Sequence, residues 1–517
     1  MERYRFKSIE FLRFFFSWLI VYHHMSVIKP FLPDIPMHQR FSCLAVDFFF
    51  ILSGFFLFYT MNNEQTVLEF LGKKFKRLWA VVAFYVVSFI CLNSFNADPY
   101  FKNMHDTVYP LLFLNNVGIT LQRSGPLWYV SVLVFVSLFY FYLYKALSKR
   151  TANLITGLLV WAAYVCIVNA QKGTISGYME IYNGIFCMGI LRGIGGMGLG
   201  IFLCYLYGDK NLLLSNRDKP SWKITLLEIA ILAWLTYAMY MAPLYIKNAI
   251  LFIIAFVVLI CFFLTERGYF SRLFDFHFSE VLGKYSYSIF LCHMPLLFLF
   301  RCVLQSHGEL THFEQILSLS LVYLIVLSVG IIVYHLIENP QNRLFKKVGY
   351  VNYYLLVFGV MLLSSFGVAE YLSHKPLRFN RTYDFSQNCM QIATSGLSHL
   401  EEWGKWSDGK EVKLKFYVKN RRKNLRFDFK IKPYLNAERP QQSVTVFANN
   451  KKITTWQFDY GQPQPKTSFV LPSGKIKGKH IKISFVIKNP VSPKELGLGS
   501  DKRRLGIGLK SMKVTEF

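Results

Sequence analysis

The feature that most constrains this chain is a series of apolar blocks, each about twenty residues long, separated by short polar links. An α-helix needs about 20 mostly apolar residues to cross the hydrocarbon core of a bilayer. Hydrophobic residues make up 53% of the 517 residues, and aromatic residues make up 17%. The pattern therefore predicts a polytopic α-helical membrane protein, for which the lipid bilayer is a permanent partner.

Eleven spans are expected, at residues 9–28, 43–61, 79–95, 126–145, 152–170, 183–207, 224–241, 246–265, 285–304, 315–338 and 351–372. Lysine and arginine concentrate in every second link, which places the N-terminus in the cytoplasm by the positive-inside rule. An odd number of spans then sends the C-terminal segment to the periplasm or the extracellular space. The short segment 107–121 contains Pro110, and we expect a re-entrant or interfacial loop there; a full span would place the C-terminal segment in the cytoplasm.

The hydrophobic pattern changes after His374. Alternating or β-branched and aromatic runs, bounded by Gly, Pro and Asn, occur at 413–419, 425–432, 443–450, 479–487 and 505–514. Such runs predict an antiparallel β-sandwich. The expected organisation is a bundle of about ten transmembrane helices (1–345), one additional transmembrane helix with a linker (346–375), and an extracytoplasmic all-β sandwich (376–517).

The first block, "EFLRFFFSWLIVYHHM" (10–25), carries an arginine near its start and two histidines near its end. Charged groups inside a membrane are costly and usually functional. Eleven helical residues turn the chain by about 1100°, so Arg13 and His24 share one face about 16 Å apart, and His23 lies about 80° away. His24 is therefore a candidate general base, and Arg13 a candidate partner for phosphate or carboxylate. The alternative is that His24 packs at the interface and Arg13 snorkels to lipid phosphate.

The second block, "LAVDFFFILSGFFLF" (44–58), carries Asp47 near its outer end. We expect Asp47 to lie at the depth of His24 and to orient its imidazole, as in acid–base dyads. The alternative is a carboxylate favoured by the helix N-terminus. Ser53 and Gly54 are expected to allow close helix packing.

An ordered set of motifs in the first 345 residues resembles the acyltransferase 3 family of integral-membrane O-acyltransferases. The motifs are Arg13 and His24 at the family's spacing, "VDFFFILSGFFL", "KKFKRLWA" (73–80), "GPLWYVSVL" (125–133), "LGKYSYSIFLCHMPL" (282–296) and "HLIENPQNR" (335–343). The resemblance implies that Arg13 and His24 are needed for activity. Lys74 and Arg77 stand where the family usually has paired arginines, and lysine lacks the arginine fork.

The resemblance also implies a donor and an acceptor. The donor would be cytoplasmic acyl-CoA, chiefly acetyl-CoA, whose phosphates Lys73, Lys74, Lys76 and Arg77 are placed to hold. These four residues serve equally well as positive-inside anchors. The acceptor would be a hydroxyl of an extracytoplasmic polysaccharide or glycolipid, such as the O-antigen of lipopolysaccharide. No metal is expected.

Three further features of the bundle have competing interpretations. Glu338 is expected either to pair with Arg77 or Arg13 or to form an ion pair at a helix end, and His293 either to line an acyl tunnel or to pack in the core. Trp128 and Tyr129 are expected first as interfacial belt residues and second as sugar-stacking residues. A different class of function also remains: a polysaccharide or lipid transporter using His24, Asp47 and Arg13 as an intramembrane path.

The C-terminal segment resembles a β-sandwich module attached to enzymes that modify surface glycans, through "SHLEEWGKWSDGKEV" (398–412) and "NPVSPKELGLGSDKRRLGIGLK" (489–510). Its excess of lysine and arginine suggests an anionic partner, such as an acidic polysaccharide or the membrane surface. Trp403, Trp406 and Trp456 are candidates for stacking on sugars, although core packing is expected for at least two of them. Nucleic acid is not expected as a partner for an extracytoplasmic domain.

Overall fold

The structure is a computed structural model of the whole chain. It describes residues 6–37, 42–62, 64–93, 104–118, 125–170, 177, 181–182, 186–207, 220–241, 250–305, 310–373, 376–377, 379–386, 392–398, 401, 403–418, 423–463, 465–475, 480–497 and 501–517. These residues form two compact units. A helical unit contains most of the described chain up to Gly359. A second unit contains the described residues from Val360 onward together with the ends of two long helices, residues 90–93 and 302–305.

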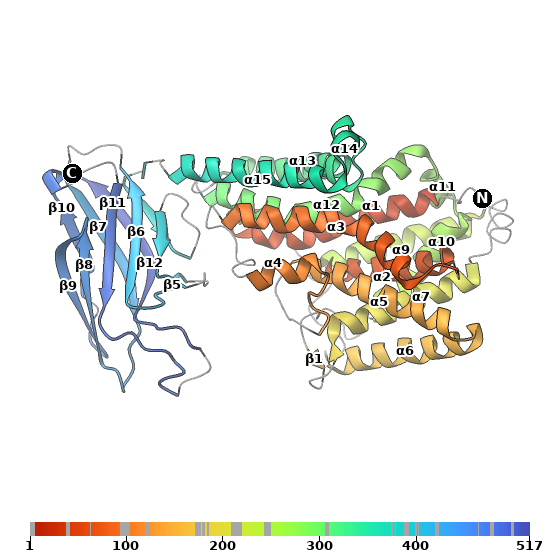
Figure 1. Cartoon of the computed structure of the whole chain (residues 1–517), viewed down its shortest axis with the longest axis horizontal. Helices are drawn as coiled ribbons and strands as arrows, with labels where there is room; N and C mark the ends of the chain where they lie inside the picture. The colour runs from red at the N-terminus through yellow and green to blue at the C-terminus, as the bar shows by residue number, and fades with distance from the viewer. Residues whose placement is uncertain are drawn as a thin grey trace. The chain divides into compact units, whose positions relative to one another are not determined.

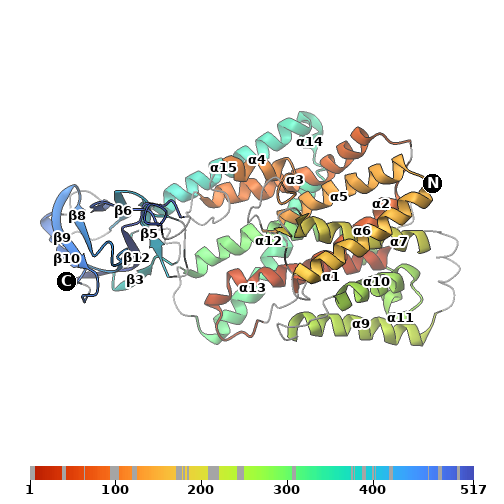
Figure 2. The same cartoon turned by 90° about the horizontal axis from the view of Figure 1, so that it is seen from below.

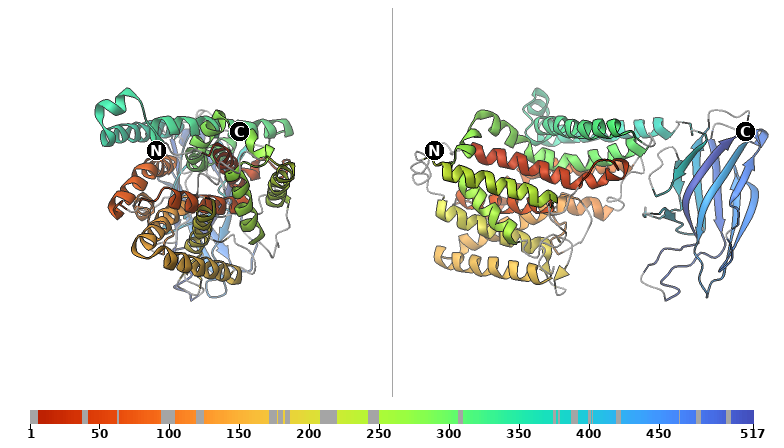
Figure 3. Two further views of the ribbon diagram at one scale, coloured as in Figure 1. Left: turned by 90° about the vertical axis from the view of Figure 1, so that its right-hand side faces the viewer. Right: turned by 180° about the vertical axis from the view of Figure 1, so that it is seen from behind.

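The helical unit is built from long helices that run along one common direction (Figure 1; Figure 3, left, views them end-on). Its elements are α1 (Lys7–His24), α2 (Ala45–Tyr59), α3 (Val67–Asn93), α4 (Met104–Leu111), α5 (Leu127–Ala146), α6 (Lys149–Ala170), α7 (Met188–Tyr207), α9 (Trp222–Met241), α10 (Ile250–Thr265), α11 (Tyr269–Leu273), α12 (His277–Gln305), α13 (His312–Val333), the π-helical turn η4 (Tyr334–Glu338), α14 (Arg343–Val348) and the first part of α15 (Tyr350–Ser373). Helices α9, α10 and α11 lie together on one side (Figure 2). Strands β1 (Ile181–Tyr182) and β2 (Phe186–Cys187) form a short antiparallel hairpin.

Eight helices of the described chain are long and apolar enough to cross a bilayer. Each of the eleven predicted spans coincides with a helix; α10 and the apolar part of α15 are shorter than those eight, and α1 carries Lys7, Glu10 and Arg13 within its length. The protein is therefore a multi-pass α-helical membrane protein. Helix α4, in the segment expected as a re-entrant or interfacial loop, has eight residues, about 12 Å, which is too short to span.

The closest helix packing joins α2 and α7, and it depends on glycine. A Cβ at Gly54 would collide with the backbone of Met197, and a Cβ at Gly200 would collide with the backbone of Ile51. Small residues allow such close approach of membrane helices, where dispersion contacts and not hydrophobic exclusion hold the helices together. The predicted packing role of Gly54 is confirmed.

The C-terminal region is a β-sandwich, as predicted. One sheet has the order β10-β7-β12-β3 with β5 also paired to β12, and the other has the order β4-β6-β11-β8-β9. The strands are β3 (Arg381–Asp384), β4 (Ile392–Ser395), β5 (Lys405–Trp406), β6 (Glu411–Tyr417), β7 (Leu425–Pro433), β8 (Gln441–Ala448), β9 (Lys451–Asp459), β10 (Ser468–Leu471), β11 (His480–Ile487) and β12 (Ile507–Glu516). Every pairing between these strands is antiparallel.

The core of the sandwich is apolar and draws on both sheets. The Phe429 ring contacts the Phe485 ring edge-on with centroids 5.1 Å apart, and Trp456 packs against both rings. Alternate residues of β6 and β8 are buried, as expected for strands with one face on a core. Trp456 is part of the sandwich core, and Trp406 is also buried, against Trp403 and Tyr434.

Candidate functional site

The helical unit contains a cavity of about 640 Å³ that is lined by basic, polar and aromatic side chains. It lies between α1, α2, α3, α5 and α12, and Ser53 and Tyr59 are among the residues that line it. The full lining is Glu10, Arg13, Val46, Phe49, Leu52, Ser53, Phe56, Leu57, Tyr59, Thr60, Phe70, Lys74, Arg77, Leu78, Tyr129, Leu133, Ser286, Tyr287 and Phe290. Its extent along α2, from Val46 to Thr60, corresponds to about 20 Å of helix.

Helix α3 supplies two of the predicted cations. Phe70, Lys74, Arg77 and Leu78 have the spacing of one helical face, and all four line the cavity. The Lys74 ammonium donates to the Ser137 hydroxyl at 3.3 Å and lies 5.6 Å from the Phe70 ring centre.

The other two predicted cations of α3 lie elsewhere on the helix. Lys73 and Lys76 are exposed and do not line the cavity. Of the four basic residues predicted to hold an acyl donor, the structure therefore places Lys74 and Arg77 at the cavity. Lys73 and Lys76 keep the alternative interpretation as positive-inside anchors.

Arg13 is held in the cavity wall by an ion pair on its own helix. Its Nη1 donates to Glu10 Oε2 at 2.7 Å. A Cβ at Gly283 of α12 would collide with the Glu10 side chain, so this glycine makes room for the carboxylate that orients Arg13. Both Arg13 and Glu10 line the cavity, as does Arg77. The cavity therefore has three cations, Arg13, Lys74 and Arg77, and one carboxylate that is already paired.

His24 lies at the end of the same helix and meets a second histidine. Its Nδ1 lies 3.0 Å from the Ile20 carbonyl oxygen and 3.1 Å from Nε2 of His293 on α12. His293 is fully buried, and its own Nδ1 lies 3.3 Å from the Ile289 carbonyl oxygen. Because a carbonyl only accepts, the arrangement favours a hydrogen on Nδ1 of each ring.

This tautomer determines which nitrogen of His24 is basic. Nδ1–H of His24 donates to Ile20 and His293, and Nε2 retains its lone pair. No described residue bonds this Nε2. The ring of the neighbouring His23 lies edge-on to the His24 ring with centroids 5.0 Å apart, and its Nδ1 lies 3.0 Å from the Ser42 hydroxyl. His24 is thus the histidine of the pair that has the geometry of a base.

The prediction that Asp47 orients His24 is wrong. Asp47 Oδ2 accepts from Nη2 of Arg192 at 2.7 Å, its Oδ1 accepts from Nε at 3.1 Å, and both side chains are fully buried. Phe48 stacks on Phe16 at 4.1 Å, which places Asp47 about 10 Å below His24 along α1. The depth was misjudged because the link between α1 and α2 contains 3-10 turns, η1 (Met25–Val27), η2 (Lys29–Phe31) and η3 (Ser42–Leu44), outside the α-helices.

Arg192 of α7 was not selected from the sequence. It donates a forked pair of bonds to Asp47, donates further to the carbonyls of Cys43 and Gly177, and lies 5.1 Å from the Trp128 ring centre. The available signal was an isolated arginine in the glycine-rich apolar run "LRGIGGMGLG". Such a cation needs a buried partner, which the structure shows to be Asp47.

Two aromatic residues expected at the membrane interface lie in the interior instead. Trp128 and Tyr129 are each 6% exposed. Trp128 packs on Arg192, and Tyr129 lines the cavity. The first two residues of α5 after Leu127 therefore contribute to the site and not to an interfacial belt.

Glu338 lies in the π-helical turn η4 and accepts a hydrogen bond from the Ser288 hydroxyl at 2.6 Å. Within the described chain it forms no ion pair with Arg77 or Arg13. The π-helical geometry shifts the register at the end of α13, and such turns are frequent at functional sites. Ser288 neighbours Ser286 and Tyr287, which line the cavity, so Glu338 lies just behind the cavity wall.

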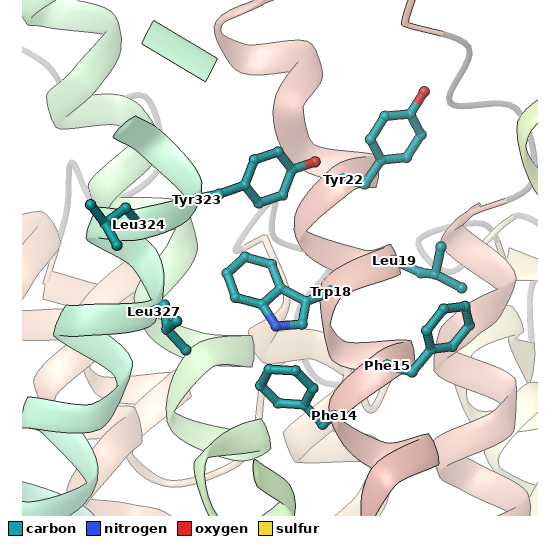
Figure 4. Close-up of a pocket in the computed structure, with 8 residues that line it drawn as sticks. All are labelled: Phe14, Phe15, Trp18, Leu19, Tyr22, Tyr323, Leu324 and Leu327. Atoms are coloured by element: carbon teal, nitrogen blue, oxygen red, sulfur yellow. The ribbon is translucent and has the colours of Figure 1, made fainter. Parts of the chain in front are cut away.

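A second hollow of about 600 Å³ lies on the outside of the bundle, between α1 and α13 (Figure 4). Phe14 and Trp18 of α1 face Tyr323, Leu324 and Leu327 of α13 across it, and Tyr22, whose ring points away from α13 in this view, also lines it. It shares no residue with the internal cavity, and its lining has no charged group. The hollow suits a lipid chain and cannot hold a polyanion.

The fold and the cavity define a multi-pass membrane protein with an internal basic site next to a histidine pair. Comparison with family models agrees: the acyltransferase domain model Acyl_transf_3 matches residues 6–370, and the chain belongs to this family. The protein is thus a membrane acyltransferase, which favours the enzyme over the transporter considered from the sequence. A domain of unknown function, DUF7024, matches residues 381–516. No curated protein and no solved structure matches the chain.

Proposed function

We propose that this membrane acyltransferase moves an acyl group, chiefly acetyl, from cytoplasmic acyl-CoA to a hydroxyl of an extracytoplasmic polysaccharide or glycolipid, such as lipopolysaccharide O-antigen. The observation that carries the proposal is one helix, α1, with Arg13 in a basic cavity and His24 beside a buried histidine. The two residues are about 16 Å apart along the helix axis. This separation suits a donor that enters from one side of the membrane and an acceptor that approaches from the other.

Arg13, Lys74 and Arg77 are the proposed partners of the donor. Acetyl-CoA is a polyanion, and arginine and lysine form charge-assisted hydrogen bonds with phosphate. Since Glu10 already pairs with Arg13, it reduces the net charge of the cavity without removing the arginine donors that face away from it. Lys73 and Lys76 would contribute only long-range attraction from the exposed face of α3.

His24 is the proposed general base. Its Nε2 accepts the proton of the acceptor hydroxyl while the hydroxyl oxygen forms a bond to the thioester carbonyl carbon. The carbon–sulfur bond then breaks, the thiolate of CoA leaves, and the proton is returned to the sulfur. His293 holds the His24 ring through Nδ1 and is a positioning residue. Asp47 acts at a distance, through the Arg192 pair that fixes α2 against α7.

The β-sandwich is proposed as an extracytoplasmic module that binds the acceptor glycan. Its segment 376–517 contains 28 lysines and arginines and 11 aspartates and glutamates, which favours an anionic polymer. This placement goes with a protein of the cytoplasmic (inner) membrane whose N-terminus is cytoplasmic. A reporter enzyme fused after Phe517 should be active only outside the cytoplasm, and cytoplasmic activity would contradict the proposed sidedness.

The central experiment is release of free CoA by the purified protein in lipid nanodiscs, supplied with acetyl-CoA and a hydroxylated surface glycan. Replacing His24 with Ala should lower kcat about 10²- to 10⁴-fold, the range for loss of a general base. His23→Ala is the matched control, because His23 is adjacent but bonds Ser42.

The activities of the His24→Ala and His23→Ala proteins decide whether His24 is the general base. Equal activity of the His24→Ala protein and the wild type, with both proteins inserted, would contradict the assignment of the base. Loss of surface-glycan acetyl content in cells that lack the protein, measured by NMR, would identify the acceptor.

A further inference from the structure

Three aromatic rings from three helices contact one another in the wall of the internal cavity. The Phe49 and Tyr129 ring centres are 6.4 Å apart, those of Tyr129 and Phe290 are 5.5 Å apart, and those of Phe49 and Phe290 are 6.5 Å apart. Each ring lines the cavity, and each pair is within the range of direct aromatic contact. We call Phe49, Tyr129 and Phe290 the ring triangle.

One ring of the triangle, Phe290, connects the cavity to the histidine pair. Phe290 is one helical turn from His293 on α12, and their ring centres are 6.3 Å apart. His293 in turn bonds His24, which does not line the cavity. A thioester whose phosphates are held by Arg13, Lys74 and Arg77 must therefore present its carbonyl carbon beside these three rings to meet the acceptor at His24.

We infer that Phe49, Tyr129 and Phe290 set the length of the acyl group that the enzyme transfers. The inference rests on the proposed function and adds its specificity. The three rings fill the volume that the methylenes of a longer acyl chain would need next to the histidine pair. A short acyl group fits against the ring faces, and a longer one has to displace a ring that is packed on two others.

The physical basis is the poor tolerance of packed interiors for added volume. Protein interiors are packed as densely as organic crystals, so inserted methylenes are strongly felt. An apolar pocket discriminates between substrates by roughly 10- to 200-fold for each methylene. Removing one ring should open space for the longer acyl chain and so lower this penalty.

The test compares acetyl-CoA with butyryl-CoA, using kcat/KM for CoA release in nanodiscs with the same glycan. The wild type should prefer acetyl-CoA. In Phe290→Ala and Phe49→Ala, the ratio of butyryl to acetyl kcat/KM should rise by about tenfold or more. Phe290→Leu should give an intermediate ratio, because leucine restores part of the volume.

Phe256→Ala is the matched control. Phe256 is fully buried, but its ring packs on Phe16 and Phe48 and it does not line the cavity. Its ratio of butyryl to acetyl kcat/KM should equal that of the wild type. Because the readout is a ratio within one preparation, partial loss of folded protein does not affect it.

Each outcome bears on a different statement. An unchanged ratio in Phe290→Ala and Phe49→Ala, or an equal rise in Phe256→Ala, overturns the role of the ring triangle and leaves the acyltransferase proposal in place. Wild-type protein that releases no CoA from any acyl-CoA overturns the proposed function and this inference together.

Discussion

The helical unit and the β-sandwich differ in where their charged side chains lie. The helical unit buries Asp47 and Arg192 completely, with 0% and 1% of their side chains exposed. In the described part of the sandwich no charged side chain is buried, and a typical ion pair, Lys413 with Glu411, is 42% and 38% exposed. The sandwich core is held by apolar area, and its charges remain on the surface.

Burial of the Asp47–Arg192 pair has a desolvation cost that the surface ion pairs of the sandwich avoid. Taking two ions out of water costs several kcal/mol per ion, which good geometry only partly offsets. In a membrane the alternative is exposure to lipid, which is also unfavourable, so buried charges are retained in pairs and usually mark function. In the helical unit the buried charges determine which helices meet, whereas in the sandwich the surface charges can change with little effect on the fold.

The largest expected effect is the loss of stability when the buried Asp47–Arg192 pair is broken. Arg192→Leu should destabilise the helical unit by about 3–5 kcal/mol, because Asp47 is left as an uncompensated buried charge. Thermal unfolding in detergent would show the loss as a lower Tm. The double variant Asp47→Leu/Arg192→Leu should recover much of the stability, and a double variant as unstable as the single one would show that the pair is not the unit that matters.

The next effect concerns the second histidine. His293→Ala should reduce kcat for acyl transfer about 100-fold, because His24 loses the acceptor that holds its ring, while KM for acetyl-CoA changes little. His293→Gln retains a side-chain acceptor and should restore part of kcat. A variant whose defect lies wholly in KM would indicate that His293 acts in donor binding and not in positioning.

The cavity cations should give a smaller and different effect. Lys74→Ala should raise KM for acetyl-CoA about tenfold, equivalent to about 1.4 kcal/mol of lost binding. Lys73→Ala is the control, since Lys73 is adjacent on α3 but exposed and outside the cavity. Equal increases in KM for the two variants would favour the alternative interpretation, in which the four basic residues are positive-inside anchors.

The smallest effect is expected on the stability of the β-sandwich when the surface ion pair of Glu411 and Lys413 is removed. The hydrogen bond from Lys413 holds the pKa of Glu411 below its ordinary value. A lowered folded-state pKa contributes stability that is present above the unfolded pKa, near 4.3, and is lost as the pH falls through the folded pKa. Glu411→Gln should therefore cost less than about 1 kcal/mol at pH 7 and nothing in strong acid. Urea unfolding at pH 7 and pH 3 would measure it, and a loss of several kcal/mol would remove the contrast between the two regions.

The sequence predicted the elements well because both periodicities are local. Eleven apolar blocks became eleven helices, and the five predicted strand segments became β6, β7, β8, β11 and β12. The missed strands have weaker patterns: β3, β4, β5 and β10 have four residues or fewer, and Lys451 and Lys452 open β9 on an edge of its sheet.

The site was predicted only where it lies on one helix. Arg13 and His24 follow from helical geometry alone, and the structure places one in the cavity and the other at the histidine pair. The partners of His24 and Asp47 come from α12 and α7, more than a hundred residues away, and their depth depends on how many residues the links consume. A single sequence does not determine how many residues the links use, and so it does not determine the depth of these partners.

The shared hydrogen bond of the histidine pair has one more consequence. In the proposed mechanism His24 accepts a proton at Nε2 while its Nδ1–H already points at the Ile20 oxygen and at His293, so the cationic ring needs no rotation to satisfy its inner nitrogen. Protonation and deprotonation would leave every heavy atom of the pair where it is. A site built in this way resets after each turnover without a conformational step of its own.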